Sequence, residues 1–144
     1  MTTVHASCVA VDGRGLLIRG PSGAGKSALA LDLIGLGAAL VADDQVGLSR
    51  HGGSVLAAPP PALAGLIEAR GLGVLRLPFA DTASVLAVLD LDAPPAPRLP
   101  EAATTDLLGV PVRLFATPCP LQPIAIFLML RHWPLLDPDA EEVR

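Results

Sequence analysis

The stretch GPSGAGKS at residues 20–27 constrains the fold more than any other part of the chain. It fits the pattern G-x-x-x-x-G-K-[ST], in which glycines let successive backbone N–H groups converge on phosphate oxygens. Lys26 adds a compact positive charge that can follow the terminal phosphates of a nucleotide, and the Ser27 hydroxyl can ligate magnesium. The pattern predicts a phosphate-binding loop formed by Gly20, Pro21, Ser22, Gly23, Ala24, Gly25, Lys26 and Ser27.

Lys26 is the only lysine in a chain of 144 residues that has 10 lysine and arginine side chains in all. A sequence that otherwise uses arginine has an ammonium group at this position, where an arginine would carry the charge on a larger, planar guanidinium group. The retained lysine favours a specific role in phosphate binding over a glycine turn that merely starts a helix.

The residues on either side of the loop have the patterns of a strand and a helix. The run GLLIRG at 15–20 is short and apolar, and KSALALDLIGLGA at 26–38 places Leu29, Leu33 and Leu36 on one helical face. This context suits phosphate binding, because a helix N-terminus points free N–H groups and the positive end of its dipole at an anion.

The length predicts a single domain over residues 1–144, large enough for its own core. No apolar run approaches the roughly 18 to 20 residues that a membrane span needs. No secretory signal is evident, and Cys8 and Cys119 are too few for a disulfide framework, so we expect a cytoplasmic protein. A net charge of −4 with scattered arginines argues against nucleic acid as the main partner.

Short apolar runs separated by turn residues predict an α/β fold with many strands. A turn at Asp12 and Gly13 is expected to join the first two strands, and 92–100 is a proline-rich surface connection. The expected strands are 4–11, 16–19, 38–42, 46–50, 54–57, 66–69, 74–77, 84–91 and 107–116, with a last helix from about 120 to 132.

Two adjacent acids, Asp43 and Asp44, follow the apolar strand at 38–42. One helix and one strand separate them from Lys26, which would bring them back beside the phosphate loop. One carboxylate could hold magnesium while the other takes a proton from an attacking hydroxyl. Neighbouring side chains on a strand point to opposite sides, so we expect the two acids to have unequal roles.

The segment EARGLG at 68–73 places charged residues in an otherwise apolar region. Glu68 and Arg70 would share one face of a strand, where glutamate suits a magnesium contact and arginine matches phosphate or carboxylate. The alternative is a structural ion pair between the two side chains. His5 lies alone on the first strand, and an isolated histidine is more often structural than catalytic.

Taken together, these residues resemble the catalytic domain of the HPr kinase/phosphorylase family. The resemblance rests on a histidine that opens the domain (His5), the phosphate loop, VADD at 41–44 and EARGLG at 68–73. It is close over residues 4–77 and follows the remainder in outline. It implies a P-loop domain of the phosphoenolpyruvate carboxykinase-like type, a mixed sheet with flanking helices.

The resemblance also implies an activity and a role for each residue. Family members transfer phosphate from ATP, with Mg2+, to a serine of the small phosphocarrier HPr, and remove it again by phosphorolysis. An HPr-like carrier and a homo-oligomer are therefore the expected partners. By the same resemblance Lys26 binds the transferring phosphates, Ser27 and Glu68 the magnesium, Asp43 is general base, Asp44 supports the acceptor or the metal, and His5 lies near the transferred phosphate.

The chain departs from the family pattern in two places. Full-length members carry another domain before this one, so we expect a short form. Near the C-terminus the family has a glycine-arginine-asparagine turn after a VPV strand, whereas this chain has Thr117, Pro118 and Cys119 there. The arginine that the family places near the acceptor phosphate is missing, and Arg113 is the nearest candidate to replace it.

These departures leave other functions open. A regulatory ATP-binding module with little catalysis is the main alternative to a serine kinase. A small-molecule phosphotransferase is less favoured, because no cluster of arginines suggests a lid over the nucleotide.

Overall fold

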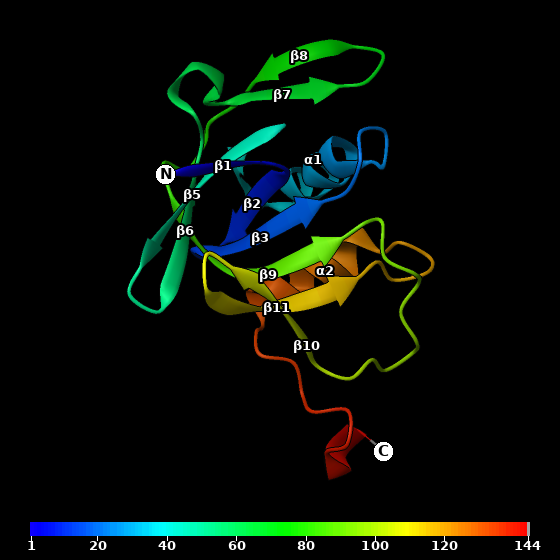
Figure 1. The fold of residues 1–144 in the computed structure, drawn as a ribbon. Coiled ribbons are helices and arrows are strands. Elements are labelled where there is room, and N and C mark those ends of the chain that lie inside the picture. The colour runs from blue at the N-terminus through cyan, green and yellow to red at the C-terminus, as the bar shows by residue number, and fades with distance from the viewer. Residues whose placement is uncertain (144) are drawn as a thin grey trace.

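The computed structural model describes residues 1–143, which form a mixed α/β fold with a nine-stranded sheet and a separate two-stranded sheet (Figure 1). The strands of the large sheet are β1 (Thr2–His5), β2 (Ser7–Val11), β3 (Arg14–Arg19), β4 (Ala39–Ala42), β5 (Gln45–His51), β6 (Ser54–Ala58), β9 (Ala83–Asp90), β10 (Ala103–Leu107) and β11 (Val110–Ala116). The small sheet is β7 (Leu66–Ala69) and β8 (Gly73–Arg76); the helices are α1 (Lys26–Leu36), α2 (Pro123–Arg131) and the 3-10 turns Pro61–Leu63 and Glu141–Val143.

Strand β9 lies at the centre of the large sheet. The strand order is β1-β5-β6-β9-β3-β2-β4, and β11 also pairs with β9 and carries β10 on its other edge. The β3–β9 and β9–β11 pairs are parallel, with Arg19 opposite Asp90 at their carboxyl ends. The connections that follow these three strands therefore emerge at one edge of the sheet, and the phosphate loop is one of them.

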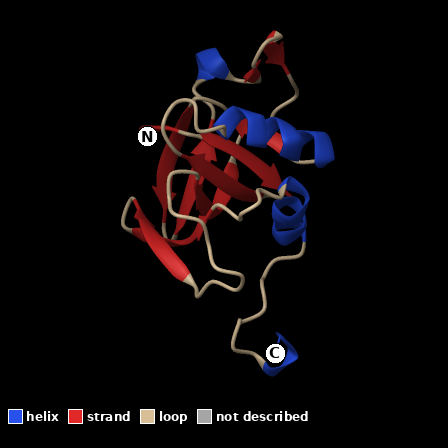
Figure 2. Cartoon of the chain, turned by 90° about the vertical axis from the view of Figure 1, so that its right-hand side faces the viewer, coloured by secondary structure: helices blue, strands red, loops and turns tan. Residues whose placement is uncertain are grey.

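Helices α1 and α2 cover the same face of the large sheet and lie to the right of its strands in Figure 2. Leu29 and Leu33 of α1 and Leu130 of α2 belong to one buried cluster with Leu16 and Ile18 of β3. A second cluster on the other face joins β2, β4, β5, β6 and β11. The sheet is thus buried on both sides at its centre, as the continuous apolar runs of its inner strands require.

Helix α1 begins and ends close to the predicted limits, but its apolar face is narrower than the sequence indicates. Leu29 and Leu33 are fully buried, whereas Leu36, which the sequence places on the same helical face, is 39% exposed. Gly37 ends the helix with a φ of 123°, and its N–H bonds to Ile34 O and Leu33 O. The helix therefore ends directly after Leu36, the last of these three leucines.

Leu33 and Leu36 allow a matched test of this packing. Leu33→Ala should lower the free energy of unfolding by about 2 to 5 kcal/mol, because it removes a fully buried side chain and leaves a cavity. Leu36→Ala, on the same helix, should change it by less than about 1 kcal/mol. Denaturant unfolding followed by circular dichroism measures both, and equal losses would contradict the described orientation of α1.

The single strand predicted over residues 4–11 is wrong, because the structure divides it at Ala6. Before the break, β1 pairs with β5; after it, β2 pairs with β3 and β4. Ala6 lies where the chain changes partners, and its N–H donates to Asp44 O at 3.2 Å. The strand is divided because its two halves pair with different, distant segments, and an apolar run alone does not predict such pairing.

The single strand predicted over residues 107–116 is also wrong, because the structure has the hairpin β10–β11 there, with its turn at Leu108 and Gly109. Most other elements agree with the sequence to within a few residues. The turn at Asp12 and Gly13 joins β2 to β3, and both residues have positive φ. The hairpins β5–β6 and β7–β8 form as expected, and α2 covers the centre of the predicted last helix. In the described part of the chain, no helix is long and apolar enough to cross a membrane.

Candidate nucleotide and phosphoryl-transfer site

The phosphate loop connects the end of β3 to the first turn of α1. Gly23 and Gly25 have φ angles of 84° and 99°, and a Cβ added at either would meet no atom within 4 Å. These glycines are therefore required by the left-handed backbone and not by lack of space. Gly25 is the N-cap of α1 and provides no side-chain cap, which leaves the first N–H groups of the helix available to an anion.

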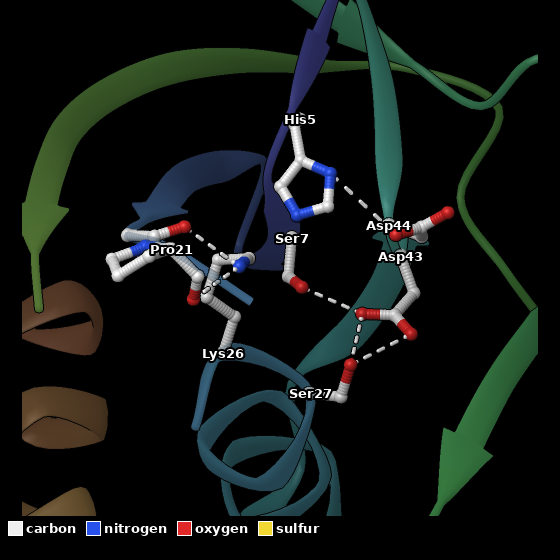
Figure 3. A network of polar contacts seen from close by, with 8 residues as sticks. His5, Ser7, Pro21, Lys26, Ser27, Asp43 and Asp44 are labelled. Carbon is white, nitrogen blue, oxygen red and sulfur yellow. Dashed lines mark hydrogen bonds and ion pairs between the residues drawn. The ribbon is translucent and has the colours of Figure 1, made fainter. Parts of the chain in front are cut away.

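The Lys26 side chain folds back over the loop, and the residue is only 7% exposed. Its Nζ donates hydrogen bonds to Gly20 O at 2.7 Å and Pro21 O at 3.1 Å (Figure 3). The two carbonyls hold the ammonium group at the inner side of the loop. An ammonium group has three donors, so Lys26 keeps one for a further acceptor.

Asp43 is buried at the end of β4 and is held by two serine hydroxyls. Ser27 Oγ lies 2.8 and 2.9 Å from the two Asp43 carboxylate oxygens, and Ser7 Oγ donates to Asp43 Oδ1 at 2.6 Å (Figure 3). Asp43 is 6% exposed and Ser7 is fully buried. The contact places a carboxylate directly beside the hydroxyl that the loop pattern assigns to magnesium.

Asp44 points away from the buried Asp43 side chain, although both residues lie in the turn between β4 and β5 and not on a strand as expected (Figure 3). Its φ is 68°, and Gln45 N–H donates to Asp43 O at 2.8 Å, which closes a γ-turn centred on Asp44. The Asp44 side chain is 66% exposed and its Oδ1 lies 3.7 Å from Nδ1 of His5. The turn therefore separates two adjacent carboxylates into a buried one and an accessible one.

These side chains line one cavity of about 720 Å3. Its floor is the phosphate loop with Asp43 and Asp44, and its opposite wall is the β7–β8 hairpin, which lies above α1 in Figure 1. Four carboxylates (Asp32, Asp43, Asp44 and Glu68) and two basic side chains (Lys26 and Arg70) face it. A triphosphate entering so acidic a cavity needs an accompanying cation to offset repulsion.

The oxygen donors of the cavity fit Mg2+ that arrives with a nucleotide. Ser27 and Asp43 supply adjacent hard oxygen ligands, and Glu68 faces the same space. No group of three His, Cys, Asp or Glu side chains among residues 1–143 could hold a metal by itself. Magnesium is commonly bound by one or two carboxylates together with substrate phosphates, which matches this donor set.

Glu68 and Arg70 both reach the cavity, but the ion pair that the sequence leaves open does not form between them. Glu68 lies in β7, and Arg70 lies in the turn beyond it; both are exposed. Within the described residues, the close acid–base contacts are His5–Asp44 and Arg19–Asp90. Both charges on the hairpin therefore remain available to a substrate.

The structure does not bring Arg113 to this cavity. It lies on β11 opposite Ala87, well before the carboxyl end of the strand, and its guanidinium lies 4.8 Å from the Phe115 ring centroid and 5.9 Å from that of Trp133. The aromatic contacts hold the charge away from the phosphate loop. Arg113 is therefore not among the residues that line the cavity at the phosphate loop.

Ser7 is the site residue that the sequence analysis missed. It lies in a fully buried strand and directly contacts Asp43. The available signal was a lone hydroxyl two residues after His5 in the otherwise apolar run ASCVAV. A buried hydroxyl needs a partner, and that requirement could have pointed to it.

The fold and this site define a P-loop domain with an acidic cavity at the end of its sheet. The family model described as HPr Serine kinase C-terminal domain matches residues 1–80. The chain therefore belongs to the HPr serine kinase C-terminal domain family.

Relatives and a solved structure agree with this membership. The chain is 43% identical over 125 residues to an HPr kinase/phosphorylase of Bordetella petrii and 44% identical over 77 residues to one of Clostridium tetani. The first match covers 78% of this chain and 41% of the relative, and the second covers 54% and 25%. This chain thus spans less than half the length of these relatives.

The structural match covers nearly the whole chain. The Hpr(Ser) kinase/phosphatase from Coxiella burnetii superposes with a TM-score of 0.80 at 27% identity, over 91% of this chain and 95% of that one. The α/β architecture expected from the sequence is thereby confirmed, including the part of the chain beyond residue 80 that the family model does not match.

Proposed function

We propose that this chain is an ATP-dependent serine kinase domain whose substrate is an HPr-like phosphocarrier protein, and that residues 1–144 act as one catalytic unit. The observation that carries the proposal is the convergence of Lys26, Ser27, Asp43, Asp44 and His5 on one cavity at the phosphate loop. The printed names of its relatives, HPr kinase/phosphorylase, support the choice of reaction and substrate.

The geometry favours a division of roles between the two aspartates that differs from the one implied by resemblance. Both oxygens of Asp43 accept hydrogen bonds from hydroxyls, so this buried carboxylate is suited to the metal beside Ser27. Asp44 is exposed to the cavity and close to His5, where it can reach a substrate hydroxyl. We therefore assign the proton-accepting role to Asp44.

In the forward reaction, the acceptor serine Oγ forms a bond to the γ-phosphorus while the bond from that phosphorus to the bridging oxygen of ADP breaks. The serine proton passes to the Asp44 carboxylate. Lys26 neutralises the charge on the transferring phosphate, and bound Mg2+ would supply further charge neutralisation. His5 keeps the Asp44 carboxylate in position through the contact at 3.7 Å.

The same groups serve the reverse reaction, phosphorolysis. Inorganic phosphate attacks the phosphorus of phosphoserine, the bond to serine Oγ breaks, and pyrophosphate leaves. The leaving serine oxygen takes a proton from protonated Asp44. The Hpr(Ser) kinase/phosphatase name of the structural neighbour supports a reversible site of this kind.

We place the reaction in the cytoplasm, and we further propose that the chain works as a homo-oligomer with no nucleic-acid partner. Exposed apolar side chains support self-association: Leu72 at the tip of the β7–β8 hairpin is 88% exposed, and Ile124 on α2 is 62% exposed.

A transfer assay tests the proposed function. With Mg2+ and ATP labelled at the γ-phosphate, the chain should label a purified HPr-like carrier, and the carrier with its acceptor serine changed to alanine should stay unlabelled. Chelation of Mg2+ should abolish the label. ATP binding without any transfer to the carrier would instead favour the regulatory module.

A further inference from the structure

A second cavity lies against the phosphate loop and the first turns of α1, next to the acidic one. Its volume is about 370 Å3, and it is lined by Ala24 and Gly25 of the loop and by residues from the connections that follow β9 and β11. Because the carboxyl ends of β3, β9 and β11 share one edge, the topology builds this cavity directly beside the phosphate loop.

The two cavities adjoin each other. Gly25, Ala28 and Asp32 line both of them, so the first turns of α1 form a shared border. The groups suited to phosphoryl transfer, including Asp43 and Asp44, all face the larger cavity. A nucleotide with its terminal phosphate there can extend across the loop, and the smaller cavity is the adjoining space for its other end.

The lining of the smaller cavity is apolar. Asp32, at the shared border, is its one charged residue; the walls include Leu91, Ala93, Pro95, Pro118 and Leu121. The polar groups of Thr117 in its wall already form hydrogen bonds within the protein. The Thr117 hydroxyl donates to Asp90 O at 3.2 Å, and Thr117 O accepts from Ala96 N–H at 3.4 Å. Such a slot suits a flat ring held by apolar contact.

We propose that this slot holds the base of the nucleoside triphosphate, between the connection after β9 and the turn at residues 117–121. The proposal rests on the proposed function, since it assumes that the phosphates occupy the loop. It gives a role to the turn that departs from the family pattern. That turn contributes Cys119 to the wall of the slot.

Cys119 makes the proposal testable by chemical modification. It is free and exposed, whereas Cys8 is fully buried and burial raises the pKa of its thiol to about 12. Iodoacetamide at neutral pH should therefore alkylate Cys119 selectively, because the thiolate is the reactive form. Unmodified Cys8 in the same sample reports that the chain stays folded.

With Mg2+ and ATP at ten times its Kd, alkylation of Cys119 should slow about tenfold, because about one-tenth of the protein remains free. Tripolyphosphate, which has no base, should slow it less than about twofold at the same saturation. Lys26→Ala should abolish the protection by ATP. Mass spectrometry of the two cysteine peptides measures the rates, and isothermal titration calorimetry of the same samples measures binding.

The outcomes separate the inference from the function on which it rests. If ATP binds by calorimetry but Cys119 reacts at its free rate, or if tripolyphosphate protects equally, the base does not lie in this slot and the kinase proposal stands. If ATP shows no binding, the proposed function fails and the inference fails with it.

A second pair of variants tests the slot without chemical modification. Ala93→Trp, which fills it, should weaken ATP binding by about tenfold to a hundredfold, the range typical of one base in apolar contact, and leave tripolyphosphate binding unchanged. Ala102→Trp is the matched control, because Ala102 is exposed and precedes β10. Equal ATP affinity in both variants would overturn the assignment.

Discussion

Lys26→Arg should lower the rate of phosphoryl transfer at least about a hundredfold, in the range found when one preorganised donor to a transition state is lost. The Lys26 ammonium is nearly buried and is held by Gly20 O and Pro21 O at 2.7 and 3.1 Å. A planar guanidinium cannot occupy this space without moving the loop, although it conserves the charge. The measurement is the initial rate of carrier labelling at saturating ATP.

Arg76 offers a control of similar chemistry. It lies on β8, is exposed, and does not line the acidic cavity, so the reverse exchange Arg76→Lys should leave the rate unchanged. A normal rate for Lys26→Arg would show that only the sign of the charge matters at this position, and the proposed role of the lysine would be wrong.

Asp44→Asn should lower the rate of transfer by about 10² to 10⁴, the usual contribution of a general base, with little change in ATP affinity. Asparagine is the right replacement because it tolerates the positive φ of 68° at this position, which alanine does not. A change in rate can then be attributed to the carboxylate and not to the γ-turn.

Asp43→Asn supplies the comparison within the same strand end. It should weaken the apparent affinity for Mg2+ in the presence of ATP by about tenfold to a hundredfold, because it replaces the carboxylate that is hydrogen-bonded to Ser27. Titration of the transfer rate with Mg2+ measures this effect. If Asp44→Asn shifts the Mg2+ requirement and Asp43→Asn does not, the two roles are assigned the wrong way round.

The phosphate loop and the acidic residues could be located from sequence because their spacing is local. Lys26 and Asp43 are joined by one helix and one strand, and this short connection returns the chain to the loop. The different orientations of Asp43 and Asp44 agree with the sequence expectation, but a γ-turn between β4 and β5 produces them and not the alternation of side chains along a strand.

The features that sequence reasoning missed depend on contacts between distant segments. The break at Ala6 arises because β1 and β2 pair with different strands, and Ser7 becomes a site residue only when β2 lies beside β4. Arg113 was placed by its nearness in sequence to the altered turn, but the parallel register with β9 fixes it away from the loop. Apolar periodicity carries no information on such pairings.

The site residues and the central strand β9, which holds the sheet together, come from different parts of the chain. The residues that face the acidic cavity lie between His5 and Val74, yet β9, at 83–90, joins β3 to β6 and to β11. A chain that stopped at residue 80 would contain these residues and lack the strand that aligns them. Residues 5–74 therefore supply the side chains of the proposed reaction, and β9 with its neighbouring strands holds them in place, so inactivating substitutions are expected far from any reacting atom.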